Sequence, residues 1–125
     1  MNVLDNLKYT EDHEWLKIEG DIAIIGITDY AQSQLGDVVF VEVNTIGETL
    51  VKGDSLGTIE AVKTVSDVYM PVSGEVLEFN EQIEQTPDII NKDPYDGGWI
   101  AKIKMNNPEE VNNLLDAAAY KALID

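Results

Sequence analysis

Short apolar and β-branched stretches, some of them alternating with polar residues, recur along most of this chain, and such stretches predict β-strands. Residues that favour turns, mainly Gly, Asp, Asn and Pro, separate these stretches. The first two stretches are expected to form an N-terminal hairpin, because only a Glu-Gly-Asp turn separates them. The expected strands are His13–Ile18, Ile22–Ile27, Asp37–Val43, Thr49–Val51, Ile59–Val62, Val65–Val68, Ser73–Asn80 and Trp99–Met105.

Helical patterns occur only at the margins of these strands. Thr28 is a good N-cap and Gly36 a good terminator, so a helix of about two turns is expected between them. Thr86-Pro87-Asp88 predicts one or two further helical turns. Asn107-Pro-Glu-Glu is expected to open a C-terminal amphipathic helix that docks on the sheet through Val111, Leu114, Leu115, Ala118 and Ala122. Many short strands with marginal helices predict a mainly β fold, a small barrel or sandwich.

One predicted hairpin, residues 57–74, carries Lys63 at its tip. If Lys63 and Thr64 are the two central turn residues, Glu60 faces Asp67, a like-charge pair that is normally destabilising. The turn also lacks the Asn-Gly or Gly-X pair of two-residue hairpins, which favours a type I turn. On these residues alone, a solvated lysine between two surface acids is the simpler interpretation. The face expected to be buried is lined by Ile59, Ala61, Val68 and Met70.

Charge and composition narrow the range of partners. The chain has 24 acidic residues against 8 basic ones, a net charge of −16, which disfavours binding to nucleic acid or to anionic membranes. An acidic exterior favours solubility and attraction to basic protein surfaces. The 125 residues are expected to form one domain, 1–125. No long apolar run could span a bilayer, and the first residues resemble neither a signal peptide nor a transit peptide, so a cytoplasmic protein is expected.

The residues needed for common catalytic sites are missing. The chain has no cysteine and one histidine, which excludes thiolate chemistry and a tetrahedral site of several His or Cys ligands. No serine lies in a nucleophile turn that His13 could serve, and Gly97-Gly98 precedes a predicted strand and not a helix. His13 beside Glu14 and Trp15 is more often a packed or hydrogen-bonded histidine than a catalytic one. The lysine at the hairpin tip is the candidate that remains.

Several motifs resemble a known family. Ile59-Glu-Ala-Val-Lys63, followed by Ser66-Asp67-Val68 and Pro71-Val-Ser-Gly74, is similar to the lipoyl-attachment hairpin. Biotinyl domains have a similar hairpin, but their acceptor lysine lies between methionines, where this chain has Val62 and Thr64. Over nearly the whole chain, the sequence resembles the H proteins of the glycine cleavage system. The other motifs that carry this resemblance are Tyr9-Thr-Glu-Asp-His-Glu-Trp15, Gly26–Gln32, Leu35-Gly-Asp37 and Thr86–Trp99.

The resemblance implies a barrel-sandwich hybrid fold and a carrier without catalytic activity. Lipoate would be attached to Lys63, Glu60 and Asp67 would flank it for recognition by the lipoate-attaching enzyme, and His13 would lie along the cleft of the loaded arm. The arm would take an aminomethyl group from glycine decarboxylase, a pyridoxal-phosphate enzyme, and pass it to the tetrahydrofolate-dependent aminomethyltransferase. Dihydrolipoamide dehydrogenase would reoxidise it.

Other functions remain open at this point. The family can also relay lipoyl groups to other lipoyl domains. The chain could instead be a free-standing lipoyl domain of a 2-oxoacid dehydrogenase, although such domains are shorter and lack the His-Glu-Trp hairpin and the Pro-Tyr-Asp-Gly-Gly-Trp loop. An unmodified acidic interaction module is the third alternative.

Overall fold

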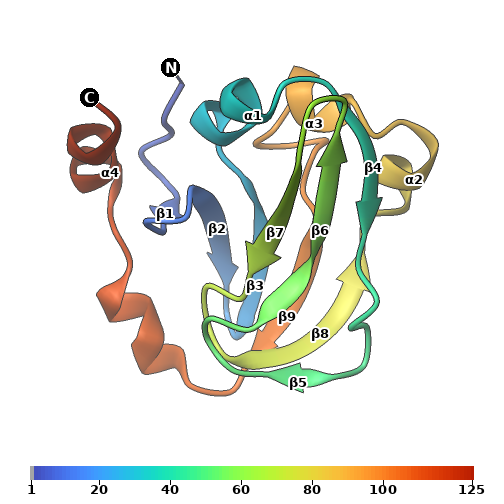
Figure 1. The fold of residues 1–125 in the computed structure, drawn as a ribbon. Coiled ribbons are helices and arrows are strands. Elements are labelled where there is room, and N and C mark those ends of the chain that lie inside the picture. Colours follow the sequence, from blue (N-terminus) through green and yellow to red (C-terminus); the bar gives the residue numbers. More distant parts are fainter. Residues whose placement is uncertain (1) are drawn as a thin grey trace.

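Residues 2–125 of the chain are described by a computed structural model, in which antiparallel strands form two sheets (Figure 1). The larger sheet has the order β1-β2-β3-β9-β8-β5, and the smaller sheet has the order β4-β6-β7. The strands of the larger sheet are β1 Lys8–Tyr9, β2 Glu14–Glu19, β3 Ile22–Ile27, β5 Thr49–Leu50, β8 Gly74–Phe79 and β9 Ala101–Met105. The smaller sheet contains β4 Val38–Glu42, β6 Ser55–Ala61 and β7 Val65–Tyr69. Each strand expected from the sequence is thereby confirmed.

Short helices lie at the margins of the sheets, as expected. Figure 1 shows α1 and α3 at the end of the molecule where the β6–β7 hairpin turns, and α4 on the outer side of β1. The predicted helix between Thr28 and Gly36 is confirmed, since the Thr28 hydroxyl accepts from the Ala31 N–H at 3.2 Å. The helices are α1 Asp29–Leu35, α2 Glu81–Gln85, α3 Ile89–Lys92 and α4 Ala117–Ile124, with a 3₁₀ helix at Pro108–Asn113.

Two hydrophobic clusters stabilise this arrangement. The larger one fills the space between the sheets, with fully buried side chains such as Ile25, Leu56 and Ile103. The smaller one, which we call the terminal aromatic cluster, joins both ends of the chain through Leu7, Tyr9, Trp15, Ala117 and Tyr120. The N-terminal hairpin β2–β3 separates the two clusters and contributes side chains to both.

The C-terminal helix is present, but it does not run continuously from Asn107 as the sequence predicted. The chain becomes extended at Leu114 and Leu115, and the Leu115 N–H and C=O both pair with Tyr9, each at 2.8 Å. A new helix then begins after Asp116, whose side chain accepts from the Ala119 N–H at 2.8 Å. As a result Ala118 is exposed, so the predicted apolar stripe was wrong beyond Leu115.

The helical turns near Thr86 also differ from the prediction. Thr86 ends helix α2, since its N–H donates to the Gln82 carbonyl at 2.8 Å, and α3 begins after Asp88. Helix α2 itself was missed, although Asn80 caps it by accepting from the Gln82 N–H at 3.1 Å. A five-residue helix offers too short a repeat for periodicity to reveal it.

Candidate functional site at the hairpin apex

The β6–β7 hairpin presents Lys63 at its apex, but in a register different from the predicted one. Ile59 pairs with Ser66 and Glu60 with Val65, and the Ala61 N–H donates to the Thr64 carbonyl at 2.8 Å. The two central residues of the turn are therefore Val62 and Lys63, and not Lys63 and Thr64. None of the turn residues has a positive φ, which agrees with the expectation that a primed turn is absent here.

The corrected register removes the like-charge pair predicted between Glu60 and Asp67. Asp67 pairs with Thr58, and Glu60 pairs with Val65, so the two carboxylates are not directly opposite each other. Both acids remain exposed on the solvent face of the hairpin. The opposite face is buried as predicted, through Ile59, Ala61, Val68 and Met70.

Contacts from the segment between α1 and β4 hold the apex in place. The Val62 N–H donates to the Asp37 carbonyl at 3.0 Å. Gly36 has a φ of +80°, and a Cβ at this position would lie 3.5 Å from Lys63 Cε, so the lysine side chain extends over this glycine. Asn91 of α3 fixes the same segment, because its amide group donates to the Gly36 carbonyl at 2.8 Å and accepts from the Val38 N–H at 2.9 Å.

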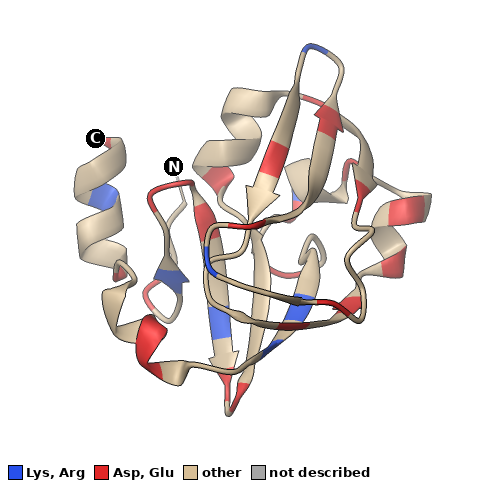
Figure 2. Ribbon diagram, turned by 60° about the horizontal axis from the view of Figure 1, so that its bottom comes forward, with Lys and Arg blue, Asp and Glu red and all other residues tan. Residues whose placement is uncertain are grey.

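Lys63 itself is exposed on this braced turn. The salt bridges found within residues 2–125 involve Lys17, Lys92, Lys102 and Lys121, and none includes Lys63. Figure 2 shows acidic residues on both strands of the hairpin below this basic apex, and further acidic patches on α2 and several loops. A free amine on a rigid, exposed turn is accessible to a modifying enzyme.

A cavity of about 150 Å³ lies beside the hairpin. Its walls come from the 12–14 loop with His13, from α1, and from Ser66 and Asp67 of β7. Ile27 and Ile59 contribute apolar surface. The structure therefore brings together two of the four residues singled out in the sequence, His13 and Asp67, while Lys63 and Glu60 lie outside the cavity lining.

Glu14 is a residue of this cavity that sequence reasoning did not single out. Its side chain is only 2 % exposed, and it accepts from the Tyr69 N–H at 2.6 Å and from the Thr10 hydroxyl at 3.2 Å. Burial raises the pKa of Glu14 from 4.5 to about 8, against the opposing effect of the Tyr69 hydrogen bond. In so acidic a sequence, no local signal distinguishes this carboxyl group from the solvated ones, because the partner N–H comes from a strand 55 positions away.

Other kinds of site find no support in residues 2–125. This part of the chain contains no group of three or more His, Cys, Asp or Glu residues that could hold a metal ion. It also contains no helix that is both long and apolar enough to cross a membrane.

Comparison with known proteins decides the family. The model of the glycine cleavage H-protein family matches residues 7–125. The chain belongs to the glycine cleavage H-protein family. It is 56 % identical over 125 residues to the glycine cleavage system H protein of Bacteroides thetaiotaomicron, covering 100 % of this chain and 99 % of that protein. The H protein of Halothermothrix orenii is 45 % identical over 125 residues, covering 100 % of this chain and 98 % of that protein.

A solved structure from the same family has the same fold. The crystal structure of a glycine cleavage system H protein from Mycobacterium marinum superimposes with a TM-score of 0.87 at 38 % identity, covering 96 % of this chain and 97 % of that one. The predicted mainly β, barrel-sandwich fold is thereby confirmed. Glycine cleavage H proteins carry lipoate on a lysine and have no catalytic activity of their own, so the predicted carrier function and cofactor are confirmed, and the alternatives are not favoured.

Proposed function

We propose that Lys63 is the lipoyl-attachment residue of this H-family protein, and that its arm carries the aminomethyl group from glycine decarboxylase to the aminomethyltransferase. The observation that supports this assignment most strongly is the exposed, unpaired amine of Lys63 on a hairpin apex that Asp37, Gly36 and Asn91 hold in place. When attached, lipoate would supply a dithiolane whose S–S bond opens to take up the aminomethyl group, with the electrons coming from the decarboxylation of glycine, and dihydrolipoamide dehydrogenase would reoxidise the dithiol left after transfer.

The residues around Lys63 fit such a group. An amide bond to lipoate removes the lysine's positive charge, and no carboxylate partner within residues 2–125 is left unpaired by that change. Asp67 lies four positions from Lys63, roughly 13 Å along an extended strand, which a long flexible arm can span. The cavity lined by Asp67 and His13 is therefore within reach of the arm, and we assign it as the cleft where the loaded arm rests.

Glu60 and Asp67 have separate parts in this proposal. Both carboxylates are exposed on one face of the hairpin, where an enzyme that binds the apex can contact them. We assign them as recognition flanks for the lipoate-attaching enzyme. Asp67 also lines the cavity, so it is the one of the two that can contact the arm as well.

The acidic surface supports docking to basic partner sites. A net charge of −16 steers a protein toward positively charged surfaces over distances of about a Debye length, roughly 8–10 Å in physiological salt. We expect the rate of transfer to and from the partner enzymes to fall as ionic strength rises. Transfer kinetics that do not change with salt would count against this steering.

The proposal includes the organisation and location of the protein. We propose that residues 1–125 act as one lipoyl-carrier domain, since the terminal aromatic cluster joins both ends of the chain. We place it in the bacterial cytoplasm because the proposed partners use pyridoxal phosphate and tetrahydrofolate, which are cofactors of intracellular metabolism. Cell fractionation followed by immunodetection tests this location.

Intact-mass spectrometry after incubation with a lipoate ligase, lipoate and ATP tests the attachment site. We expect the wild-type chain to gain one lipoyl group and the Lys63→Arg variant to gain none. Lys92→Arg is the matched control, because Lys92 is an exposed lysine of α3 near the same end of the molecule. A lipoyl group retained in Lys63→Arg, or an unmodified wild-type chain, would contradict the proposal.

A further inference from the structure

His13 has an unusual backbone conformation beside the cavity. It has a φ of +67°, and among residues 2–125 it is the one non-glycine residue with a positive φ. Hydrogen bonds hold this conformation, because the His13 N–H donates to the Thr10 carbonyl at 3.1 Å and its carbonyl accepts from the Thr28 N–H at 3.0 Å. A strained conformation that neighbouring contacts maintain often serves to direct a side chain at a functional site.

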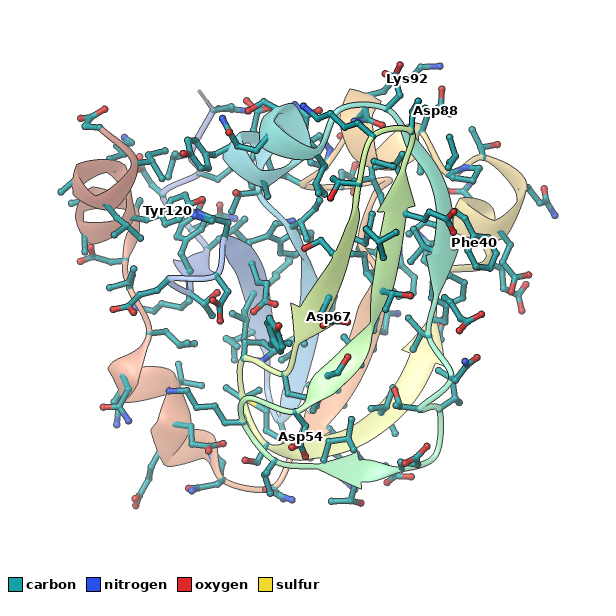
Figure 3. All side chains as sticks on the ribbon, in the orientation of Figure 1. Phe40, Asp54, Asp67, Asp88, Lys92 and Tyr120 are labelled. Atoms are coloured by element: carbon teal, nitrogen blue, oxygen red, sulfur yellow. The ribbon has the colours of Figure 1, made fainter. Side chains whose placement is uncertain are left out.

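The ring of His13 is anchored by the C-terminal helix. Its Nδ1 atom lies 2.9 Å from the hydroxyl oxygen of Tyr120, which in turn lies 2.7 Å from the hydroxyl oxygen of Thr28. Tyr120 is fully buried, and its ring stacks on that of Tyr9 with the centroids 4.6 Å apart. Figure 3 shows Tyr120 between α4 and the rest of the molecule, so the position of this hydroxyl depends on how α4 packs.

The number of hydroxyl protons determines the direction of these hydrogen bonds. The Thr28 hydroxyl already accepts from the Ala31 N–H, and because Thr28 is fully buried its own proton cannot go to solvent. Among residues 2–125, the acceptor in hydrogen-bonding position for that proton is the Tyr120 oxygen. Tyr120 then has one proton left to donate, and His13 Nδ1 is the acceptor. A neutral histidine that accepts at Nδ1 carries its proton on Nε2.

We propose that Tyr120 is a positioning residue that holds His13 in the neutral Nε2–H form, so that the C-terminal helix sets a hydrogen-bond donor in the wall of the cavity. Since Nδ1 is engaged with Tyr120, Nε2 is the ring nitrogen left for a molecule in the cavity. The ligand class that matches it is a hydrogen-bond acceptor, and the amide carbonyl of a lipoyl-lysine arm is one. That choice of occupant rests on the proposed function, whereas the tautomer does not.

The surroundings of the ring favour its neutral form. Burial lowers the pKa of His13 and outweighs Asp12, which acts in the opposite direction. The other titratable groups that face the ring or share its cavity are Glu14 at the start of β2, Tyr30 of α1 at a centroid distance of 4.7 Å, Asp67 of β7, and Tyr120. Of these, only Tyr120 is in hydrogen-bonding contact with the imidazole.

Nitrogen NMR of the ¹⁵N-labelled protein tests this proposal directly, because the chain has a single histidine. At pH 7.5, the two-bond ¹H–¹⁵N spectrum of the unmodified wild type should show an unprotonated Nδ1 and a protonated Nε2. In Tyr120→Phe, the tautomer ratio should shift by roughly fivefold toward Nδ1–H, the size expected for loss of one hydrogen bond. The pKa of His13 should rise as well, because the lost hydrogen bond favoured the neutral ring.

The matched control is Tyr95→Phe, which removes a hydroxyl from a tyrosine next to the terminal aromatic cluster that has no contact with His13. A wild-type spectrum with the proton on Nδ1, or a Tyr120→Phe spectrum equal to that of the control, would overturn the proposal. The wild-type spectrum decides the tautomer even if Tyr120→Phe does not fold. Lipoylation should shift the His13 resonances. Unchanged resonances would reject the arm as occupant but leave the tautomer standing.

Discussion

The β6–β7 hairpin lines the cavity directly, whereas the terminal aromatic cluster acts on it through Tyr120, which contacts His13 of the cavity wall, and the two regions are stabilised in different ways. The hairpin keeps its apex exposed, with Val62 75 % accessible, and the hydrogen bond from the Val62 N–H to the Asp37 carbonyl holds this apex against the 36–38 segment. The cluster buries Trp15 and Tyr120 almost completely, and its side chains hold the His13 loop. Changes at the apex should therefore alter modification with little effect on stability, and changes in the cluster should do the reverse.

Trp15→Ala should have the largest effect on stability. The Trp15 ring packs so closely on Gly26 that a Cβ there would lie 2.6 Å from it, and its Nε1–H donates to the Pro94 carbonyl at 2.8 Å. Truncation of a buried tryptophan costs about 3–5 kcal/mol of unfolding free energy, which urea denaturation measures. Val62→Ala, at the exposed apex, is the control and should change this free energy by less than about 0.5 kcal/mol. A comparable loss in both variants would remove the distinction between the two regions.

Glu14→Gln should change how stability depends on pH. The pKa of Glu14 is raised to about 8 in the fold, so the native state binds a proton that the unfolded chain releases near pH 4.5. This contribution to stability is present below about pH 4.5 and is lost as pH rises through about 8. The free energy of unfolding of Glu14→Gln minus that of the wild type should therefore increase as the pH rises from 5 to 8.5, by an amount on the order of a few kcal/mol.

Glu60→Gln is the control for this measurement, because Glu60 is an exposed acid on the hairpin. Chemical denaturation of all three proteins across the pH range gives the comparison. A difference between Glu14→Gln and the wild type that stays constant with pH would show that the Glu14 carboxyl titrates normally.

Gly36→Ala should lower both the stability of the fold and the rate of lipoylation at Lys63. Gly36 has a φ of +80° and a ψ of −158°, a combination that essentially only glycine adopts, so an alanine there costs about 1–3 kcal/mol, and its Cβ would also contact the Lys63 side chain. Gly47→Ala is a close control, since Gly47 has a φ of +86° and no atom within 4 Å of a Cβ placed there. Both variants should lose stability by denaturation, but only Gly36→Ala should slow lipoylation of Lys63. Equal lipoylation rates would show that the contact with Gly36 does not orient the lysine.

Val62→Thr should have the smallest effect on stability, within about 0.5 kcal/mol, because the side chain is exposed and the substitution keeps its shape. If the modifying enzyme contacts the apolar apex, the kcat/KM for lipoylation should fall. Val51→Thr, at a 60 % exposed valine far along the chain from the apex, should leave it unchanged. Identical kcat/KM values for the two variants would exclude Val62 from the contact surface.

The sequence predicted the strands and the buried face of the hairpin, because β-branched and apolar runs bounded by turn residues identify them locally. It could not predict the register, because either Val62-Lys63 or Lys63-Thr64 makes a two-residue turn. The hydrogen bond from Val62 to Asp37, a contact between distant segments, accompanies the register that is found. The break in the C-terminal helix has the same kind of cause, since pairing of Leu115 with Tyr9 competes with helix formation.

The site was only partly predictable for the same reason. Lys63 was found through its motif, which is local in sequence. The cavity beside it is formed by the 12–14 loop, α1 and β7, and the burial of Glu14 depends on the approach of Tyr69. The environment of His13 depends on Tyr120, 107 positions away. Such environments arise from packing between distant segments, so a single sequence shows the residues but not their surroundings.

Transfer of a labelled glycine carbon tests the central claim most directly. The lipoylated protein is incubated with glycine decarboxylase and [2-¹³C]glycine and then analysed by intact-mass spectrometry and peptide mapping. We expect the label on the peptide that contains Lys63, and none on the Lys63→Arg variant after the same lipoylation treatment. Label that is absent from the lipoylated wild type, or that is present in Lys63→Arg, would contradict the assignment of Lys63 as the carrier residue.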